Sequence, residues 1–588
     1  MMVAVVLVGV WGSHEAEGTK LGGLGEASSS FWSPARAENG GVPCNACVIM
    51  AQMFIVKLES EPSTIDEALH DFCSFLPSPA NSVCREYVNK YGATLVDAFF
   101  EYESADRICA ALGLCTNPEQ CVMYPGKAPP AHTWEERKQN DGKGPQLLLK
   151  RLADDPPHIP EWLLFLGNRL GNDHLPLDDF DNDYFSPLWR TLRGRDWRGQ
   201  DCNDLDPQVH PGVVPLNEDR EWDSNCNGIY GVDNSTKKPW ESELCSVPQM
   251  GVAIVGDSVG AHFAFPCSWY FPAPGVYHDA FTVIENELDW PFASWITGFR
   301  NDTTGSLDPD RGYGSLPLDS VYLRMLERNR CVFNDFQNLA VNGADSGEST
   351  EIIKALSRDQ QKDRPMLFFQ ALIGDDICDH RSESGWTQPQ EFADNINKNL
   401  AYLDTKLPPG SFVVNIGLID GRVIWDTLFD KPYPFSPQTL GGNATYATWW
   451  DFQTCLGTVV CWGWMNPNAT IRDQATQRAM QLNAVFKNIT AGGSLGNNAT
   501  YQNFQMAYYD FPIYEMFDML IAQGGTPLDF FEPFLGLHPT QRAVAMLGGI
   551  LFNKIEKDYG DLALGPVNPN NAKIIQLFGV NQNPNNDS

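Results

Sequence analysis

The sequence is poor in basic residues, and it lacks both long apolar runs and clustered zinc ligands. Its 41 lysines and arginines are outnumbered by 74 aspartates and glutamates, which gives a formal net charge of −33. This charge argues against binding of nucleic acid or of an anionic membrane by bulk electrostatics. No run of about 18 apolar residues marks a membrane span, and no Cys/His cluster has zinc-ligand spacing. With 43% hydrophobic residues, the 588-residue chain is long enough for several globular domains.

Several features point to the secretory pathway. Residues Val3 to Trp11 form a short apolar core, so residues 1–20 are predicted to be a signal peptide, although the usual basic residue before the core is absent. The 15 cysteines, many of them closely spaced, favour an oxidising compartment. We therefore expect a secreted or lysosomal/endosomal glycoprotein. The acceptor sites for N-glycosylation are Asn234, Asn301, Asn443, Asn468, Asn488, Asn498 and Asn586.

Residues 41–121 form a cysteine-dense segment with helical patterning. Cys47 opens an apolar helical run that continues to Leu58, and Ser63 to Glu67 has the pattern of a capping box before a second helix. A third helix is predicted after Pro79. The six cysteines of the segment allow 15 pairings, and their spacing alone cannot select one. They are Cys44, Cys47, Cys73, Cys84, Cys109 and Cys115.

The Cys-x-x-Cys start, the central cysteine pair and the Cys-x5-Cys end of this segment resemble the saposin B family. The resemblance implies four amphipathic helices and three nested disulfides, Cys44–Cys115, Cys47–Cys109 and Cys73–Cys84. It also implies contact with a lipid, membrane or micelle surface, because helices of this type can open and expose their apolar faces. Packing of those faces against each other or against the larger domain is the alternative.

A segment rich in proline, lysine and glycine, residues 122–160, is predicted to be an exposed linker. Its Lys150-Arg151 pair is a candidate proteolytic processing site. Cys121 lies just outside the six-cysteine segment, and we expect Cys455 or Cys461 to be its partner. That bridge would keep two subunits joined after a cut. The remaining cysteines are odd in number, so one of them would stay without a partner in this chain. They are Cys202, Cys226, Cys245, Cys267, Cys331 and Cys378, with whichever of Cys455 and Cys461 does not pair with Cys121.

Residues 161–245 contain acidic loops with the spacing of oxygen ligands. Asp179 to Phe185 and Asp223 to Ile229 place polar side chains at alternate positions, as calcium loops do, and the seventh residue of such a loop supplies its backbone carbonyl. Arg190 and Asn234 occupy position 12, where an EF-hand has glutamate. A solvated acidic surface is the alternative, and Mg²⁺ is disfavoured because it retains several waters. We predict a Ca²⁺ cofactor with the ligands Asp179, Asp181, Asp183, Phe185, Asp201, Asn203, Asp204, Asp206, Asp219, Asp223, Asn225, Asn227 and Ile229.

Residues 246–580 are predicted to form an α/β domain with a parallel sheet between two layers of helices. The first strand runs into Gly256, Asp257 and Ser258. A parallel strand delivers its last residues to the edge of the sheet where ligands bind, so Ser258 is a candidate nucleophile. An ordinary Gly-Asp-Ser turn is the alternative. The predicted strands are Val252–Val255, Arg364–Ile373, Ser411–Gly417 and Met506–Asp510, and helices are predicted over Asp319–Arg330 and Gln541–Lys557.

The order of four motifs resembles the GDSL (SGNH) lipase and esterase family. With the saposin-like and acidic segments in front, residues 41–580 as a whole resemble the acyloxyacyl hydrolase family. That resemblance implies a secreted or lysosomal lipase, processed into two disulfide-linked subunits, which removes secondary fatty acyl chains from the lipid A of bacterial lipopolysaccharide. The four motifs are Gly256-Asp257-Ser258, Asn342-Gly343, Gly374-Asp375-Asp376 and His538-Pro539.

The resemblance also implies catalytic roles. Ser258 would attack the ester carbonyl, and His538 would accept the serine proton as general base. The backbone N–H groups of Ser258 and Gly343 and the side chain at position 375 would form the oxyanion hole. The family has asparagine at this third position, where this chain has Asp375. An ionised carboxylate cannot donate a hydrogen bond, so only a protonated Asp375 could serve, which an acidic compartment and a dry pocket would favour.

A second departure concerns the acid that orients the histidine. The family has an aspartate three residues before it, and Leu535 stands there in this chain. Glu532, Asp529 or a backbone carbonyl would have to orient His538 instead. Three functions remain open: a lipopolysaccharide acyl-ester hydrolase, a phospholipase or lysophospholipase of the same mechanism, and a catalytically impaired lipid-binding protein. The further histidines are expected to pack or to line the pocket rather than act as the base; they are His262 and His380.

Overall fold

The computed structural model describes residues 174–187, 193–265, 288–300, 318–378, 382–436, 444–493 and 501–582, together with parts of residues 39–124. Those parts are 39–41, 44–45, 47–49, 51–52, 55, 85, 89, 104–111, 115–116 and 119–124. Several predicted features lie outside the described residues. They are the signal peptide, the Cys73–Cys84 bridge, the Lys150-Arg151 pair, Cys267 and His380.

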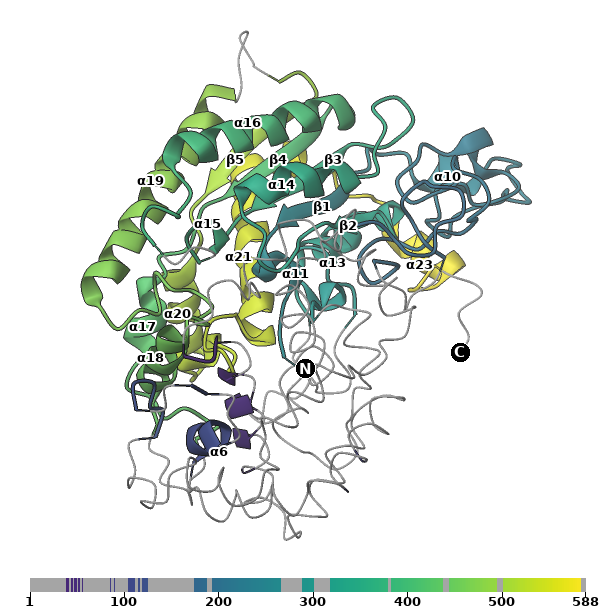
Figure 1. Cartoon of the computed structure of the whole chain (residues 1–588). Helices are drawn as coiled ribbons and strands as arrows, with labels where there is room; N and C mark the ends of the chain where they lie inside the picture. The colour runs from purple at the N-terminus through teal and green to yellow at the C-terminus, as the bar shows by residue number, and fades with distance from the viewer. Residues whose placement is uncertain are drawn as a thin grey trace, which may run out of the picture.

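A parallel sheet of five strands forms the centre of the molecule, in the order β2-β1-β3-β4-β5 (Figure 1). All four strand pairs are parallel. Every residue of β1, β3 and β4 is buried, which explains why these strands are mainly apolar. The direction of strand addition reverses between β1 and β3, and ligands bind at such a reversal at the carboxyl ends of the strands. The strands are β1 Gly251–Gly256, β2 Phe336–Asn338, β3 Met366–Ala371, β4 Ser411–Ile416 and β5 Phe504–Tyr509.

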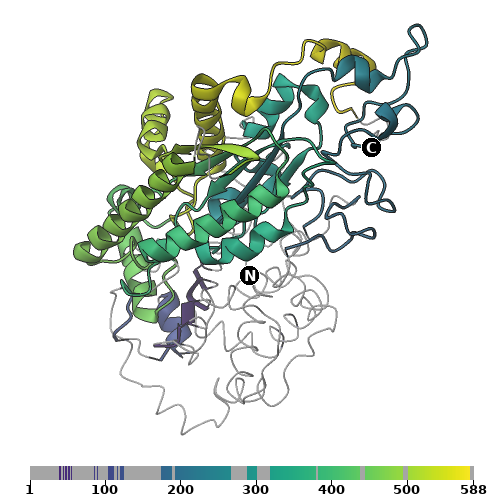
Figure 2. The same cartoon turned by 90° about the horizontal axis from the view of Figure 1, so that it is seen from above.

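Helices cover both faces of the sheet. In the view from above, α14, α16 and α19 lie on one side and α13 and α21 on the other (Figure 2). The predicted α/β class with a parallel sheet is thereby confirmed. The helices are α10 Trp240–Leu244, α11 Ser258–Ala261, α13 Val321–Arg328, α14 Ser346–Ile352, α15 Asp375–Cys378, α16 Pro389–Lys406, α17 Arg422–Leu428, α18 Tyr446–Leu456, α19 Ala469–Gly493, α20 Ile513–Ala522, α21 Gln541–Tyr559, α22 Asp561–Leu564 and α23 Asn571–Phe578.

The described part of the saposin-like segment packs against the α/β domain. Its helix α6 (Ala105–Ala111) carries Cys109, which is bonded to Cys47, and Cys44 is bonded to Cys115. Both are pairs that the saposin resemblance implied. A third disulfide, Cys121–Cys455, joins the segment to α18 of the α/β domain. Its buried apolar residues belong to the same core cluster as the sheet.

The predicted linker is wrong at its beginning. Met123 is fully buried and Tyr124 is 3% exposed, although the prediction placed an exposed linker from residue 122. The carboxylate of Asp106 accepts the backbone N–H groups of both residues, at 2.9 and 3.2 Å. The hydroxyl of Tyr124 accepts a hydrogen bond from Gln52 at 2.7 Å. These contacts hold residues 121–124 to the saposin-like segment.

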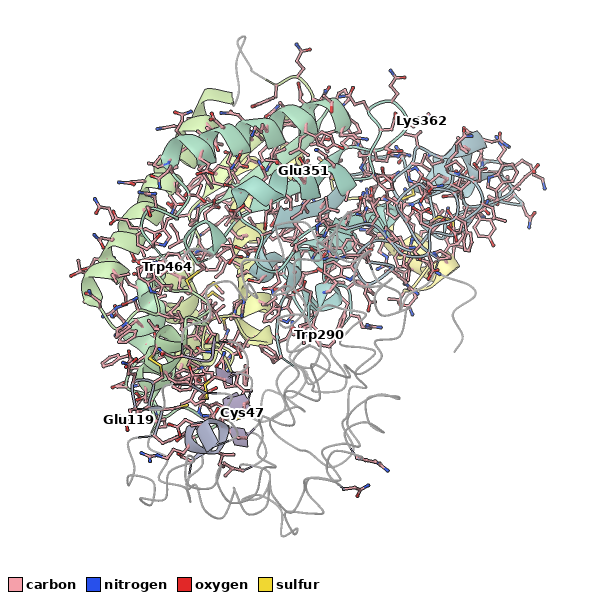
Figure 3. All side chains as sticks on the ribbon, viewed as in Figure 1. Cys47, Glu119, Trp290, Glu351, Lys362 and Trp464 are labelled. Atoms are coloured by element: carbon pink, nitrogen blue, oxygen red, sulfur yellow. A yellow bond between two sulfur atoms is a disulfide. The ribbon has the colours of Figure 1, made fainter. Side chains whose placement is uncertain are left out.

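The acidic region is attached to the edge of the sheet rather than forming a unit of its own. Arg198 pairs with Gln337 of the edge strand β2 in an antiparallel bridge, and Cys245 is bonded to Cys331. The chain end also reaches this region, because Gln582 donates to the carbonyl of Asn227. Figure 3 shows Cys47 of the saposin-like segment and Lys362, whose carbonyl accepts the N–H of Val214 in the acidic region, at opposite ends of the molecule.

Candidate active site and acidic loops

The turn after β1 places Ser258 at the carboxyl edge of the sheet. Gly256 ends the strand, and a Cβ there would lie 2.5 Å from the carbonyl oxygen of Ala371 on β3, so only glycine fits. Asp257 caps the short helix α11, because its carboxylate accepts the N–H of Val259 at 3.0 Å. Ser258 is therefore the first residue of a helix, directly beyond a buried strand. It is 7% exposed.

Asp257 also fixes the distance between the two central strands. Its second carboxylate oxygen accepts the backbone N–H groups of Ile373 and Gly374, at 2.5 and 2.9 Å. Both residues directly follow β3. Burial raises the pKa of Asp257 to about 6, while these backbone donors oppose that rise. The side chain thus joins the end of β1 to the end of β3 at the point where the strand order reverses.

The hydroxyl of Ser258 and the imidazole of His538 meet directly. Ser258 Oγ lies 2.9 Å from His538 Nε2, within hydrogen-bond distance, and His538 is 4% exposed. The two residues are 280 positions apart in sequence and come from the two ends of the α/β domain. This is the separation that proton transfer from a serine to an imidazole requires.

A tight turn before α21 carries His538. The backbone N–H of Glu532 donates to the carbonyl of His538 at 2.8 Å, and Thr540 caps α21. The carboxylate of Glu532 accepts the N–H groups of Phe534 and Leu535, both at 2.7 Å. Burial raises the pKa of Glu532 to about 7 despite these donors. The carboxylate of Glu532 therefore stabilises the turn by accepting these backbone N–H groups.

Among the described residues, the second nitrogen of His538 has no partner of the kind that a Ser-His-Asp triad provides. Among the described residues, no group forms a hydrogen bond with His538 Nδ1, which is buried. Leu535 is 5% exposed, and its carbonyl accepts from the indole of Trp450. Neither of the carboxylates proposed as orienting groups contacts this nitrogen, since Glu532 binds backbone N–H groups and Asp529 accepts from Thr526.

The surroundings of His538 disfavour its charged form. Burial and, as the smaller effect, the nearby His262 together lower the pKa of His538 to about 3. The ring of Phe263 packs against the imidazole, with centroids 4.7 Å apart. His262 caps the end of α11 in the left-handed region, with φ 59°. The imidazole is therefore held neutral.

The candidate oxyanion donors lie on separate segments around Ser258. Gly343 sits in a tight turn with φ +85°, and the space where a Cβ would point is open. Within the described part of the chain, the N–H groups of Ser258 and Gly343 have no hydrogen-bond acceptor. Asp375 begins α15 directly after β3. All three positions thus lie beyond the carboxyl ends of β1, β2 and β3.

Aromatic side chains continue from the imidazole toward the saposin-like segment. Phe265 contacts Phe263 and Phe534, and Phe435 contacts Phe534 and Tyr433, with centroids 4.6 to 5.4 Å apart. Tyr433 is fully buried, and burial, Tyr446 and Tyr124 all raise its pKa well above the usual value. The backbone N–H of Trp290, which is labelled in Figure 3, donates to the carbonyl of Ala261 at the end of α11. The surroundings of the Ser258–His538 pair are thus mainly aromatic.

Two of the predicted acidic loops come together in one cluster. Carboxylate oxygens of Asp179, Asp181 and Asp183 lie within 4.8 Å of one another, and so do those of Asp181, Asp201 and Asp204. The backbone N–H of Phe180 donates to Asp204 and so joins the two loops. Cys202 and Cys226, although close by, are bonded to each other and offer no thiolate.

Several carboxylates of this cluster are buried with too few hydrogen-bond donors among the described residues to stabilise their charge. One oxygen each of Asp181, Asp183 and Asp201 is buried with no hydrogen-bond partner among the described residues. Burial, followed by repulsion from the neighbouring aspartates, raises the pKa of Asp183 to about 8 and that of Asp201 to about 7, although backbone donors oppose the rise. Oxygen atoms of this kind fit a hard divalent cation. Three predicted ligands have a more peripheral place, with Asn203 and Asp206 in the turn after Asp201 and Phe185 buried beside the cluster.

The third predicted loop forms a separate group around Glu241. The side-chain amides of Asn225 and Asn227 donate to Glu241, at 3.3 and 3.0 Å. Burial raises the pKa of Asp219 to about 6, of Asp223 to about 7 and of Glu241 to about 7. Ile229 is fully buried in the same loop. Sequence reasoning missed Glu241, because nothing in its spacing from Asp223 marks it as a partner of this loop.

Comparison with known proteins agrees with this architecture. The family model described as saposin-like type B, region 2, matches residues 82–115. Saposin-C of Cavia porcellus is 33% identical over 76 residues, which cover 13% of this chain and 94% of that protein. Among the described residues no helix combines the length and apolar character needed to cross a membrane.

Two further relatives extend over nearly the whole chain. Acyloxyacyl hydrolase of Homo sapiens is 33% identical over 559 residues, covering 92% of this chain and 93% of that protein. Acyloxyacyl hydrolase of Oryctolagus cuniculus is 32% identical over 565 residues, covering 93% of this chain and 94% of that protein. A likeness of this extent covers more than nine-tenths of the chain. The chain belongs to the acyloxyacyl hydrolase family of lipid-modifying hydrolases.

Proposed function

We propose that this protein is a secreted or lysosomal serine esterase that removes secondary fatty acyl chains from the lipid A of bacterial lipopolysaccharide. The 2.9 Å contact between Ser258 Oγ and His538 Nε2 is the observation that carries the proposal. The substrate class follows from the relatives, whose name specifies an acyl chain esterified to another acyl chain. The fold supports it as well, because the pair lies at the reversal of strand order where open α/β sheets bind ligands.

Acylation requires only the two side chains and the substrate. Ser258 Oγ attacks the ester carbonyl while its proton passes to His538 Nε2. The resulting tetrahedral intermediate breaks its bond to the leaving hydroxyacyl chain, which takes the proton from the imidazole. Water then attacks the acyl-enzyme with His538 again as base, and the proton returns to Ser258 as the fatty acid leaves.

Two backbone N–H groups are available to stabilise the oxyanion of both intermediates. The N–H groups of Ser258 and Gly343 have no acceptor within the described part of the chain, so they can bind the developing charge without breaking another bond. Removal of one such donor typically costs about 10²–10³ in kcat. Asp375 can act as a third donor only when its carboxyl is protonated.

No acid orients His538 within the described part of the chain, and this favours slow turnover. The imidazole becomes charged during each proton transfer, and burial disfavours that charge in His538. No described group contacts Nδ1 to fix the tautomer. In a Ser-His-Asp triad, loss of the acid's function costs about 10⁴ in kcat. This observation supports a second candidate, a lipid-binding protein with weak or no esterase activity.

The saposin-like segment supplies the lipid contact in this proposal. It is bonded to the α/β domain through Cys121 and Cys455, and its described apolar residues share the core of that domain. Acyl chains taken up by this segment would therefore be presented close to the aromatic side chains that lead to His538. A cut in residues 125–160 would leave two subunits joined by the same disulfide.

We further propose that Ca²⁺ stabilises the acidic loops. Asp179, Asp181, Asp183, Asp201 and Asp204 fit such an ion, because their oxygens converge and several are buried without partners. Asp219, Asp223, Asn225 and Glu241 form the second group of oxygen atoms. The bound ion would supply positive charge and would not take part in the ester chemistry. Both groups lie in the acidic region at the edge of the sheet, away from the saposin-like segment (Figure 1).

Fatty-acid release tests the proposal directly. Purified protein should release secondary acyl chains from lipopolysaccharide faster than it releases fatty acid from phosphatidylcholine, and Ser258→Ala should abolish both reactions. Preference for phosphatidylcholine or its lyso form would instead identify a phospholipase or lysophospholipase. Equal rates for the native protein and Ser258→Ala, on lipids and on a short-chain p-nitrophenyl ester, would leave the lipid-binding protein as the function.

A further inference from the structure

One buried side chain connects the two backbone segments that carry the candidate oxyanion donors. Asn338, the last residue of β2, is 1% exposed. Its side-chain amide donates to the carbonyl of Gly260 and to the hydroxyl of Thr297, both at 3.0 Å. Its side-chain oxygen accepts the backbone N–H of Ala340, also at 3.0 Å. Asn338 thus uses both ends of its amide group.

The two backbone groups that Asn338 holds lie close to the donors in sequence. Gly260 belongs to α11, two residues after Ser258, and Ala340 precedes Gly343 by three residues. The segments also touch, because a Cβ at Gly260 would lie 2.9 Å from the Cβ of Ala340. A change in the side chain of Asn338 would therefore alter the position of one segment relative to the other.

Other contacts hold the outer side of the same peptide but do not replace this link. Arg193 donates to the carbonyl of Ala340 at 3.4 Å, and its guanidinium lies 3.7 Å above the ring of Trp197. Trp197 packs against Ala261 and Ala340, and its carbonyl accepts the N–H of Asn338 at 2.7 Å. These contacts fix Ala340 from the side of the acidic region, whereas the side chain of Asn338 joins it to α11.

The separation of the two donors matters because an oxyanion must be within reach of both. Donors act best at 2.7 to 3.1 Å from the position the oxyanion takes, and an error of about 1 Å in such geometry can cost about 10²-fold in rate. The N–H groups of Ser258 and Gly343 belong to segments about 85 residues apart. Backbone hydrogen bonds from Leu339 to Ile254 and from Val341 to Gly256, at 2.8 and 3.0 Å, join these segments at the ends of β1 and β2. The side chain of Asn338 adds the link from β2 to α11, which carries Ser258.

We propose that Asn338 is a positioning residue, which sets the distance between the N–H groups of Ser258 and Gly343. The inference rests on the proposed esterase function and adds to it. A residue of this kind supports the transition state through the backbone and does not touch the substrate. Its loss should lower kcat and leave KM nearly unchanged, since ground-state binding does not use the oxyanion donors.

A matched control is available in β4. Asn415 is fully buried, donates to Thr490 at 2.9 Å and accepts from Gln370 at 3.0 Å, so it resembles Asn338 in burial and bonding. It forms no hydrogen bond with the segments of Ser258 or Gly343. Asn415→Ala therefore reports the cost of deleting a buried strand amide, separately from any effect on the oxyanion donors.

The experiment uses the full-length protein and two readouts. Asn338→Ala should lower kcat on a p-nitrophenyl ester at least tenfold more than Asn415→Ala does, with KM within about twofold of the native value. The rate of covalent labelling of Ser258 by a fluorophosphonate should fall in the same proportion, because its phosphoryl oxygen binds the same donors. Thermal midpoints should be similar in the two variants. Asn338→Ser serves as the second variant if Asn338→Ala does not fold.

Equal losses of kcat in the Asn338 and Asn415 variants would overturn the inference and leave Asn338 as an ordinary core residue. A rise in KM without a fall in kcat would overturn it as well. Failure of the esterase function looks different, because the native protein and Ser258→Ala would then hydrolyse the ester equally and neither would be labelled. That result would remove the basis of the inference.

Discussion

Glu532 holds His538 through the backbone and not through its carboxylate. The N–H of Glu532 donates to the carbonyl of His538 at 2.8 Å, while the carboxylate accepts the N–H groups of Phe534, Leu535 and Gly536. The acid closest in sequence to His538 is therefore already committed to the turn. Glu532 therefore stabilises the turn without orienting the imidazole ring. An aspartate at position 535, as in the family, would orient the ring directly.

Replacement of Glu532 tests this separation. Glu532→Gln places an amide nitrogen among backbone N–H donors, so at least one of them is left unpaired in a buried site. Each such loss costs about 1–3 kcal/mol of the free energy of unfolding, which thermal or denaturant unfolding would measure.

The pH dependence of kcat/KM should keep its shape in Glu532→Gln, because the carboxylate does not contact the imidazole. Glu391→Gln, at the exposed start of α16, is the control for the chemical change itself. A shifted acidic limb in Glu532→Gln would contradict the structural role and indicate direct coupling to His538.

Catalysis should persist to unusually low pH. A general base must be neutral, and burial together with His262 lowers the pKa of His538 to about 3. The neutral fraction therefore stays high from pH 7 down to about pH 4, whereas an ordinary imidazole with a pKa of about 6.5 would lose most of it. Measurement of kcat/KM on a soluble ester should give a flat profile over this range. A half-maximal value near pH 6.5 would contradict the prediction.

Much of the fold could be predicted because it depends on local patterns. The strands β1, β3, β4 and β5 are mainly apolar, and their bounds agree with the predicted strands within a few residues. The strand β2 was missed, because Phe336–Asn338 is only three residues long and follows polar residues. Its place in the sheet is set by pairing with β1 on one side and with the acidic region on the other.

The candidate site likewise has features that the sequence could predict and features that it could not. The meeting of Ser258 with His538 could be anticipated from the order of the motifs and the family that this order resembles. Ser258 follows β1, whereas His538 lies before α21 and not at the end of a strand. The lack of a hydrogen-bond partner for His538 Nδ1 among the residues that the structure describes could not be anticipated, because it depends on which way the carboxylate of Glu532 turns. The partners of Asn338 and Glu241 depend on contacts between distant segments, and no spacing in the sequence reports them.

Removal of divalent cations should destabilise the protein through the acidic loops. Without an ion, the buried oxygens of Asp183 and Asp201 lack partners, and the charged forms are disfavoured by burial. Addition of Ca²⁺ to chelator-treated protein should therefore raise the thermal midpoint by several degrees, as mass action on a folded-state site requires.

The response should weaken in Asp201→Asn, which removes one buried charge, and persist in Asp233→Asn, whose carboxylate lies outside both clusters and binds Ser235. Scanning calorimetry with and without Ca²⁺ measures both variants. An equal shift in the two variants, or none in the native protein, would contradict a site in these loops.

The Cys121–Cys455 disulfide should determine whether the two parts of the chain stay together after cleavage. It joins residues 334 positions apart, and it is the described covalent link between the saposin-like segment and α18. A specific protease site introduced at Lys150-Arg151 would cut between the two cysteines. The cleaved protein should then run as one species on a denaturing gel without reductant and as two with it.

Cys455→Ser should give two species under both conditions, because noncovalent packing does not survive the denaturant. The double variant Cys378→Ser/Cys461→Ser should behave like the native protein, since its bridge lies entirely within the α/β domain. Persistence of one unreduced species in Cys455→Ser would require another bond across the cut and would contradict the assignment.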